Sequence, residues 1–399
     1  MTHPPLSLVR LRPKADVRAI RHGFPWVFAD ELVTDRRTRA LAPGTIARLE
    51  DAERRPLGTV AVNPNSKIIC RMLDRDPEAE IGEDWFAARL RRALALREAA
   101  FAAPFYRLIH AEADGLPGVV IDRFGEAAVV QPNAAWAESR LDALIAALRS
   151  VTGVRAVVKN GTGRARTLEG LPEETVLLEG TVEAPVPVPM NGATYMADLL
   201  GGQKTGLFFD QRPNHAFAAT LAKGGDVLDV FSHVGGFGLA ALAGGAARAV
   251  CVDGSAPALE LAEQGAAASG VAERLETRRG DAFDAMAALA EDDVRFHLVV
   301  CDPPAFAPSK QALEAGLRAY ERVARLGAGL VRAGGFLVLC SCSHAADLSR
   351  FRAASVRGIG KAGRRGQIIH TGFAGPDHPM LPQLAESGYL KVLFFRLTE

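Results

Sequence analysis

The sequence predicts an α/β protein: a doubly wound, Rossmann-like sheet in the carboxyl-terminal half, preceded by a small β-rich domain and an α+β domain. Two observations predict this class. After residue 190, short apolar runs alternate with helical patterns five times, which is typical of a parallel sheet with helices on both faces. Residues 1–75 instead hold short strand-like runs broken by Pro, Gly and Asn. We therefore expect three domains, at residues 1–75, 76–188 and 189–399.

Composition narrows the class further. The chain has 399 residues, of which 48% are hydrophobic and 23% charged, as expected of a globular protein with more than one domain. It has no apolar run of about 18 residues and no apolar core near its amino terminus. We therefore expect a cytoplasmic protein with no membrane partner. The five cysteines are odd in number and lack paired zinc spacing, so no metal site is expected.

The positive charge is concentrated at the amino terminus. The whole chain has a net charge of +1, but residues 1–75 contain 14 Lys and Arg against 8 Asp and Glu, a net charge of +6. This indicates a polyanionic partner such as RNA, although a solvated surface is an equal alternative. In RAIRHGFPWVF the cations stand beside aromatic rings that can stack on bases, while core packing of Trp26 and Phe28 is the other interpretation. The candidate RNA-binding cations are Lys14, Arg18 and Arg21.

The middle segment reads as alternating helices and strands. Residues 84–102 have apolar side chains at helical spacing with Arg on the opposite face, which predicts an amphipathic helix. The expected elements after it are two strands within 106–131, a helix at 137–151, and strands at 154–160 and 174–180. The proline-spaced run VEAPVPVPMNG at 182–192 is a predicted linker.

Seven strands are expected in the last domain. They are the runs VLDV, RAVCVD, LETRRGD, HLVVCD, FLVLCS, QIIHTG and YLKVLFFRL. The last two have little between them to form a crossover helix, so they are expected to pair antiparallel. A seven-stranded sheet with an antiparallel edge suits a class I methyltransferase better than a dinucleotide dehydrogenase.

Four acidic residues mark the carboxyl ends of the predicted strands, where open α/β sheets bind ligands. In the expected roles, Asp229 meets the methionine ammonium of S-adenosylmethionine, Asp253 the ribose hydroxyls and Asp281 the adenine edge. Asp302 is the fourth acid assigned to this pocket. Between the first two lies FSHVGGFG, where Gly235, Gly236 and Gly238 are expected to let the backbone approach the cofactor closely before the following helix begins.

NAD is the alternative cofactor, because Gly236, Gly238 and Ala241 fit the pattern G-x-G-x-x-A. A single fingerprint of this kind is weak. Asp229 would crowd a pyrophosphate, and an Asp-Pro-Pro corner on the fourth strand has no role in the dehydrogenase pattern. We therefore favour S-adenosylmethionine.

The corner CDPPAF suggests a flat acceptor. Two prolines end the strand, so that Pro303, Pro304 and Phe306 can cradle a ring while Asp302 engages its polar edge. An exocyclic amine of a base carries its own lone pair, whereas C5 of a pyrimidine needs a nucleophile added at C6. The fifth strand ends in LVLCSCSH and places Cys342 past its apolar run, as a candidate for that nucleophile. The same pattern places Cys301 and Cys340 in the core and His344 at the surface.

The chain resembles the RlmI-like large-subunit rRNA methyltransferases, which make 5-methylcytosine. The matching motifs are KADVRAIRHGFPWVF (14–28), HAEADGLPGVVIDRFG (110–125), GGQKTGLFFDQRPNH (201–215), DVFSHVGGFG (229–238), CDPPAFAPSK (301–310), CSCS (340–343) and DHPMLPQLAESGYLK (377–391). The resemblance implies an RNA-binding PUA domain, an α+β connecting domain and a catalytic sheet. It also implies that Cys342 is the nucleophile, that residues 231–238 form the cofactor loop, and that Gln211 and Arg212 lie near cofactor or substrate.

Two departures from that family's pattern stand out. The family reads C-Y-T-G-G-F where this chain has Ser232, His233 and Val234 before its glycines, so the polar contacts of the loop change. The second cysteine of other RNA 5-methylcytosine enzymes is also absent, because Ala305 follows Pro304. Removal of the C5 proton would then need another base, which the sequence does not name.

The resulting hypothesis is methyl transfer from S-adenosylmethionine to C5 of a cytosine in large-subunit rRNA. Cys342 attacks C6 and Asp302 holds the N3/N4 edge, while the basic run at 357–366 and the amino-terminal domain grip phosphates. Two alternatives stay open: an N-methyltransferase acting on a purine base of RNA, and a non-catalytic RNA-binding protein. The oligomeric state is also open, with a homodimer as one candidate.

Overall fold

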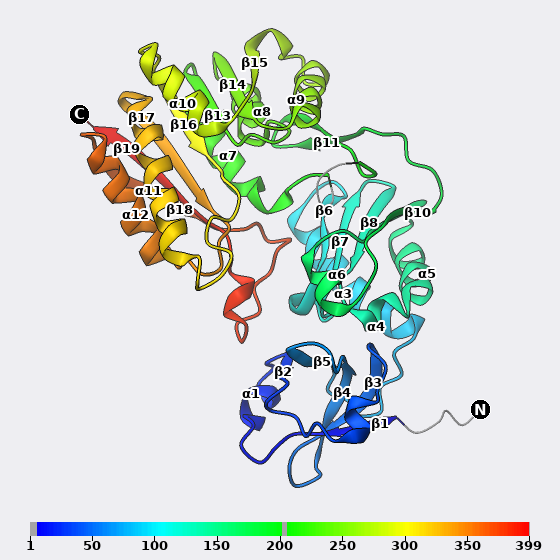
Figure 1. Ribbon diagram of the computed structural model, residues 1–399. Helices are drawn as coiled ribbons and strands as arrows, with labels where there is room; N and C mark the ends of the chain where they lie inside the picture. The colour runs from blue at the N-terminus through cyan, green and yellow to red at the C-terminus, as the bar shows by residue number, and fades with distance from the viewer. Residues whose placement is uncertain (1–5, 202–205, 399) are drawn as a thin grey trace. The chain divides into compact units, whose positions relative to one another are not determined.

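The computed structural model describes residues 6–201 and 206–398 (Figure 1). These residues divide into two compact units. The first comprises the described residues of Met1–Glu183, Leu199–Thr205 and Pro376–Ser387; the second comprises those of Ala184–Asp198, Gly206–Gly375 and Gly388–Glu399. The boundaries expected from the sequence, at residues 75 and 188, stay a prediction.

A five-stranded sheet begins the first unit, with the strand order β1-β3-β4-β5-β2. Its strands are β1 (Ser7–Arg10), β2 (Trp26–Phe28), β3 (Thr45–Glu50), β4 (Pro56–Val62) and β5 (Ile68–Asp74), with the short helices α1 (Val17–Arg21) and α2 (Arg36–Arg39). β1 pairs parallel with β3, and the other pairs are antiparallel. Because side chains alternate across a strand, Val27, Leu49 and Val60 reach one shared apolar core.

A second five-stranded sheet completes the first unit, in the order β10-β9-β8-β7-β6. Its elements are α3 (Glu83–Ala100), β6 (Phe105–His110), β7 (Val119–Phe124), β8 (Ala127–Pro132), α4 (Ala135–Glu138), α5 (Leu141–Thr152), β9 (Ala156–Asn160), α6 (Arg164–Glu169) and β10 (Thr175–Glu179). The amphipathic helix expected at 84–102 is α3. It buries Phe86, whose ring stacks on that of Trp136 at 5.9 Å between centroids.

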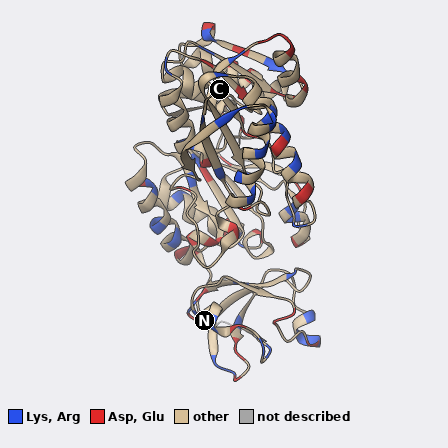
Figure 2. Cartoon of the chain, turned by 90° about the vertical axis from the view of Figure 1, so that its left-hand side faces the viewer, with Lys and Arg blue, Asp and Glu red and all other residues tan. Residues whose placement is uncertain are grey.

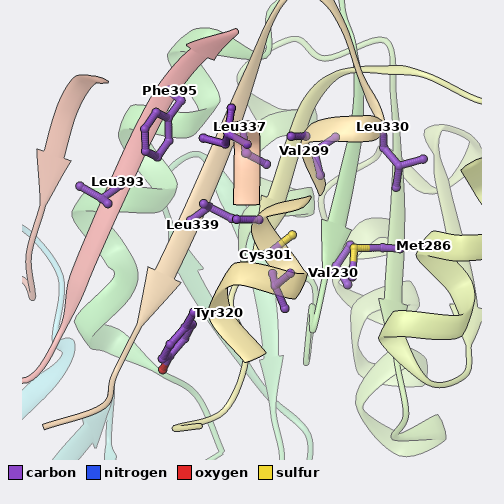
Figure 3. Close-up of a cluster of buried hydrophobic side chains, with 14 of the residues drawn as sticks. Val230, Met286, Val299, Cys301, Tyr320, Leu330, Leu337, Leu339, Leu393 and Phe395 are labelled. Atoms are coloured by element: carbon purple, nitrogen blue, oxygen red, sulfur yellow. The ribbon is translucent and has the colours of Figure 1, made fainter. Parts of the chain in front are cut away.

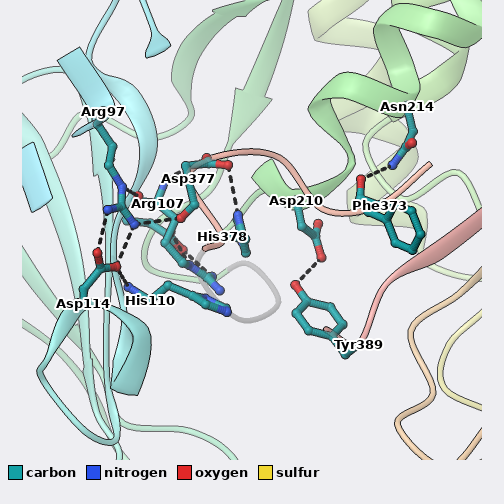
Figure 4. Close-up of polar contacts among 11 residues, drawn as sticks. Arg97, Arg107, His110, Asp114, Asp210, Asn214, Phe373, Asp377, His378 and Tyr389 are labelled. Atoms are coloured by element: carbon teal, nitrogen blue, oxygen red, sulfur yellow. Dashed lines mark hydrogen bonds and ion pairs between the residues drawn. The ribbon is translucent and has the colours of Figure 1, made fainter. Parts of the chain in front are cut away.

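The segment Pro376–Ser387 belongs to the first unit, although it follows β18 in the sequence. Arg97, on α3, is fully buried and binds both carboxylate oxygens of Asp114 at 2.7 Å (Figure 4). The same guanidinium donates to the backbone carbonyl of Asp377 at 2.9 Å, and the Asp377 carboxylate accepts the backbone N–H of Arg107 at 3.1 Å. One buried arginine therefore joins α3, Asp114 and the carboxyl-terminal segment.

A seven-stranded sheet forms the second unit, in the order β15-β14-β13-β16-β17-β19-β18. Its strands are β13 (Asp226–Val230), β14 (Arg248–Asp253), β15 (Leu275–Arg279), β16 (Phe296–Cys301), β17 (Val331–Ser341), β18 (Arg365–Gly372) and β19 (Lys391–Thr398). The first five are parallel, and β19 is antiparallel to both β17 and β18. The expected antiparallel pair is confirmed, and its antiparallel member is β19, one strand in from the edge.

Helices cover both faces of this sheet. They are α7 (Arg212–Leu221), α8 (Gly236–Ala243), α9 (Ala256–Ala268), α10 (Ala282–Glu291), α11 (Leu313–Gly329) and α12 (Leu348–Lys361); a hairpin of β11 (Val186–Met190) and β12 (Ala193–Ala197) precedes them. Val230, Val299 and Leu337 pack against α10, α11 and α12 in one core cluster (Figure 3). Residues of the opposite parity face α8, where Gly238 approaches Cys251 and Asp229.

The fold class predicted from the sequence is therefore confirmed. Within residues 6–201 and 206–398, no helix combines the length and apolar character needed to cross a membrane.

Candidate active site

Asp229 is a buried carboxyl on β13, at the start of the predicted cofactor pocket. Its Oδ2 accepts the backbone N–H of Gly238 at 2.8 Å. Its Oδ1 is also buried and has no hydrogen-bond partner within the described part of the chain. Burial raises the pKa of Asp229 to about 7; the Gly238 N–H acts in the opposite direction, and the charge of Asp302 adds to the rise. A buried acceptor of this kind is suited to a cationic ligand.

The glycines of the loop after β13 are required by its geometry. Gly235 has φ 77°, in the left-handed region that favours glycine, and Gly236 is the first residue of α8. A Cβ on Gly236 would lie 2.8 Å from the ring of His215, and one on Gly238 would lie 2.5 Å from the Cys251 sulfur. Neither glycine can be replaced without displacing a neighbour, so the backbone of this loop stays close to the sheet.

The carboxylates of Asp253 and Asp281, at or just beyond the ends of β14 and β15, accept hydrogen bonds from backbone N–H groups. Asp253, the last residue of β14, accepts from His233 and Ser255, each at 2.8 Å. It thereby holds the loop that carries Phe231, which has a positive φ of 62°. Asp281 is exposed, lies two residues beyond β15, and caps α10 by accepting the N–H of Phe283 at 2.8 Å.

Gln211 and Asp302, both singled out in the sequence, lie in direct contact. Gln211 Nε2 donates to Asp302 Oδ2 at 2.9 Å, directly after β16. Asn214 orients this amide, because its Nδ2 donates to Gln211 Oε1 at 2.8 Å and to the Phe373 carbonyl at 3.0 Å (Figure 4). Sequence reasoning did not single out Asn214; its position three residues after Gln211, near the start of a helix, was the available signal.

The neighbours of Gln211 fix the segment that leads into α7. The Arg212 guanidinium lies 5.4 Å from the centre of the Phe209 ring, and the Arg212 carbonyl accepts from Asn191 at 2.9 Å. The Tyr389 hydroxyl donates to Asp210 at 2.6 Å (Figure 4). The preceding QKT of the GGQKTG motif, residues 203–205, lies outside the described residues.

The Asp-Pro-Pro corner is partly open. Pro303 is buried and Pro304 is exposed. Phe306 is half-buried, with its ring 5.1 Å from that of Tyr320 and 6.4 Å from that of Phe231, measured between centroids. The aromatic ring that the sequence assigned to the substrate therefore packs against other rings and remains partly accessible.

Cys342 differs from the other cysteines. It follows the last residue of β17 and is half-buried, whereas Cys70, Cys251, Cys301 and Cys340 are buried. Burial raises the pKa of each of those four thiols. Cys342 is thus the one accessible thiol among the five, and it lies at the same edge of the sheet as Asp302.

The serines on either side of Cys342 are fixed by a tyrosine on α11. The Tyr320 hydroxyl accepts from Ser341 Oγ at 2.9 Å and shares a 2.7 Å hydrogen bond with Ser343 Oγ. Ser343 Oγ also accepts the backbone N–H of Ala307 at 3.0 Å, which ties the loop after β17 to the loop after β16. Sequence reasoning did not assign these residues a role.

The candidate RNA-binding cations lie in the first unit. Lys14 and Arg18 are exposed, while Arg21 pairs with Asp51 at 3.1 Å. The rings of Phe24, Trp26 and Phe28 form a triangle with 6.3 Å between each pair of centroids. Trp26 is half-buried, and Phe28 is 37% exposed. Neither ring is fully in the core.

Comparison with known proteins agrees with this architecture. The family described as "S-adenosylmethionine-dependent methyltransferase" matches residues 146–395, and the one described as "PUA-like domain" matches residues 9–75. A putative methyltransferase from Streptococcus mutans has a TM-score of 0.81 at 19% identity, covering 98% of this chain and 100% of its own. A second solved structure, a putative methyltransferase complexed with SAH, has a TM-score of 0.81 at 20% identity, with the same coverage. The fold and site thus define an S-adenosylmethionine-dependent methyltransferase with a PUA-like domain.

Full-length relatives specify the family. The chain is 35% identical to the ribosomal RNA large subunit methyltransferase I of Alteromonas mediterranea, over 98% of this chain and 99% of the relative. It is also 35% identical to the protein of that name from Photobacterium profundum, over 95% and 96%. The chain belongs to the ribosomal RNA large subunit methyltransferase I family. The predicted enzyme class, cofactor and PUA-like domain are confirmed.

Proposed function

We propose that this enzyme transfers the methyl group of S-adenosylmethionine to C5 of a cytosine in large-subunit rRNA, through a transient bond between Cys342 and C6. The names of the relatives support the substrate class. The observation that carries the C5 chemistry is the position of Cys342. It is the accessible cysteine of the five, and it lies at the carboxyl edge of the sheet, on a loop tied to the Asp-Pro-Pro corner.

A carbon acceptor requires a thiolate. C5 of cytosine has no free lone pair, but addition of sulfur to C6 pushes an electron pair through the ring and makes C5 nucleophilic. S-Adenosylmethionine supplies an electrophilic methyl group on a sulfonium. After C5 has been methylated, its proton leaves to a base, the electron pair returns through the ring, and the C6–S bond breaks to release the thiolate. The serines held by Tyr320 would fix the direction from which the thiol approaches.

Asp302 would hold the amino edge of the cytosine. Its carboxylate can accept a hydrogen from N4, and Gln211 fixes its orientation through a hydrogen bond of 2.9 Å. Pro303, Pro304 and the exposed part of Phe306 would then border the ring. The base has to leave its stack first, which costs a few kcal/mol and favours a loop or a partly assembled RNA.

The cofactor would be held by the carboxyl ends of β13 and β14. The buried Asp229 Oδ1, which lacks a protein partner among the described residues, fits the ammonium group of the methionine moiety. Gly235 and Gly236 allow the backbone to approach, Asp253 faces the ribose, and the remaining assigned contacts are Phe231, Asp281 and Arg212. The glycines that keep this loop close to the sheet support the assignment.

Cofactor affinity should depend on pH through Asp229. Because burial raises its pKa to about 7, this carboxyl is largely protonated below pH 7 and cannot then pair with an ammonium. We expect the affinity for S-adenosylmethionine, measured by isothermal titration, to be highest near about pH 7.5. It should fall about tenfold per pH unit below about pH 6.5, where Asp229 is protonated, and it should also weaken above about pH 8, where the α-amino group of the ligand loses its proton. Asp229→Asn should bind weakly and without the loss of affinity below pH 6.5, while Asp292→Asn, at an exposed position with no assigned role, serves as the control. A flat wild-type profile would contradict the role of Asp229.

RNA would be gripped by phosphate contacts from the first unit, with Lys14 and Arg18 more available than the paired Arg21. Lys and Arg residues also occur on other elements, interspersed with Asp and Glu residues (Figure 2). The basic run at 357–366 offers less charge than its sequence suggests, because Arg357 and Lys361 share Glu321. As an rRNA enzyme it would act in the cytoplasm; assembly as a homodimer stays a prediction.

Nucleoside mapping tests the proposed function. Large-subunit rRNA from cells lacking the enzyme is incubated with the protein and S-adenosylmethionine carrying an isotopically labelled methyl group, then digested and examined by mass spectrometry. We expect the label in 5-methylcytidine at one position. Label in an N-methylated purine would favour the purine alternative, and no incorporation despite cofactor binding would favour a non-catalytic RNA-binding protein.

A further inference from the structure

Lys391 is a buried cation that the proposed chemistry has not yet used. It is the first residue of β19 and is 5% exposed. Its ammonium donates to the backbone carbonyl of Ser343 at 2.6 Å. Within the described residues, no carboxylate lies within ion-pairing distance of it. A buried ammonium without an anionic partner is unfavourable, so its presence needs a reason.

Lys391 pairs with or contacts the residues on both sides of Cys342. In the β17–β19 ladder, Lys391 lies directly opposite Ser341, the residue before the cysteine. Its hydrogen bond reaches Ser343, the residue after it. Burial lowers the pKa of Lys391 to about 8, while the charges of Cys342 and Asp347 act in the opposite direction. Because a pKa of about 8 lies above neutral pH, Lys391 remains mostly charged at pH 7 and is electrostatically coupled to Cys342.

We propose that Lys391 is a positioning residue whose buried ammonium stabilises the thiolate of Cys342. This inference rests on the proposed function, since it supplies the ionised sulfur that addition to C6 requires. As the C6–S bond forms, the negative charge leaves the sulfur. When that bond breaks, the thiolate regains its counter-charge. The same ammonium would therefore favour both the nucleophile and the leaving group.

The other titratable groups near the cysteine do not replace Lys391. Tyr320, on α11, is neutral at pH 7, because burial raises its pKa and Cys342 adds to the rise. Asp347, before α12, is exposed and pairs with Arg350. The carboxyl group of Asp302, after β16, cannot supply the positive charge that stabilises a thiolate. His344 is exposed on the cysteine's own loop. Lys391 is thus the buried cation among these groups.

Alkylation of the free protein tests this inference without RNA. Because four of the five cysteines are buried, iodoacetamide should modify Cys342 first, and peptide mass spectrometry can follow its rate between pH 5.5 and 9.5. For Lys391→Met we expect the pH of half-maximal rate to rise by about one unit or more, which lowers the rate about tenfold at pH 6.5. Lys391→Arg should keep most of the wild-type profile. The exposed Lys223→Met is the matched control, and Cys342→Ser gives the background.

The outcomes separate the two proposals. A folded Lys391→Met protein with the wild-type pH profile would overturn the role of Lys391 and leave the proposed function intact. Full methylation by Cys342→Ser would overturn the proposed function whatever the alkylation profile shows. If Lys391→Met unfolds, judged by circular dichroism, Lys391→Gln takes its place. A rise in the midpoint for Met or Gln together with rescue by Arg supports the inference, because loss of packing alone would not shift the titration.

Discussion

Replacing Cys342 by Ala is expected to lower the rate of methyl transfer to cytosine by at least about 10⁴-fold, because the variant has no atom that can add to C6. Affinity for S-adenosylmethionine should change by less than about twofold, since none of the residues assigned to the cofactor lies on the loop after β17 that carries Cys342. Single-turnover methylation of rRNA and isothermal titration of the cofactor measure the two quantities separately.

A matched cysteine variant and a covalently trapped RNA complex test whether Cys342 itself is the nucleophile. Cys340→Ala removes a buried thiol two residues earlier on β17 and should retain a rate within about threefold of the wild type. RNA with 5-fluorocytosine at the target should remain covalently attached to the wild-type protein. Release requires a base to remove the hydrogen on C5 as a proton, and a fluorine in its place cannot be removed in this way. Cys342→Ala should form no such complex. A Cys342→Ala rate within tenfold of the wild type would rule out the carbon chemistry.

Replacing Arg97 by Met should lower the free energy of unfolding of the first unit by about 3–5 kcal/mol. Arg97 is fully buried and binds both oxygens of Asp114, so its loss leaves a buried carboxylate without a counter-charge. The Asp377 carbonyl loses a donor as well. Urea denaturation measures the global effect, and hydrogen exchange should show reduced protection around residues 376–387.

Two further variants identify the cause. Arg149→Met breaks an ion pair with Glu179 in which both side chains are exposed. It should lower the free energy of unfolding by less than about 1 kcal/mol. The double variant Arg97→Met with Asp114→Leu should recover part of the lost stability, because it removes the unpaired charge. A double variant no more stable than Arg97→Met would instead indicate that packing of the arginine stem is what stabilises the unit.

The sequence predicted what depends on order along the chain. Alternating strand and helix patterns determine the parallel sheet, and the carboxyl ends of its strands lie at one edge, so the location of Asp229, Asp253 and Asp302 along that edge could be predicted from position alone. Their roles toward cofactor and substrate stay a prediction. Cys342 was separated from Cys340 in the same way, since it lies past the apolar run.

Contacts between segments that are far apart in the chain could not be predicted from local sequence patterns. The register that places Lys391 opposite Ser341 depends on which strand lies between β17 and β18, and no local pattern specifies this. The Tyr320 contacts to Ser341 and Ser343 depend on how α11 packs on the sheet. Likewise, only the fold shows that Glu321 neutralises cations of the run 357–366.

The place of Pro376–Ser387 in the first unit has a consequence for biosynthesis. A polypeptide leaves the ribosome from its amino terminus, so the strands and helices up to Glu183 emerge long before this segment exists. Until then, Arg97 lacks the Asp377 carbonyl that it binds in the finished protein. A nascent chain that stalls before residue 376 therefore carries an incomplete amino-terminal unit, and maturation of that unit requires synthesis of Pro376–Ser387.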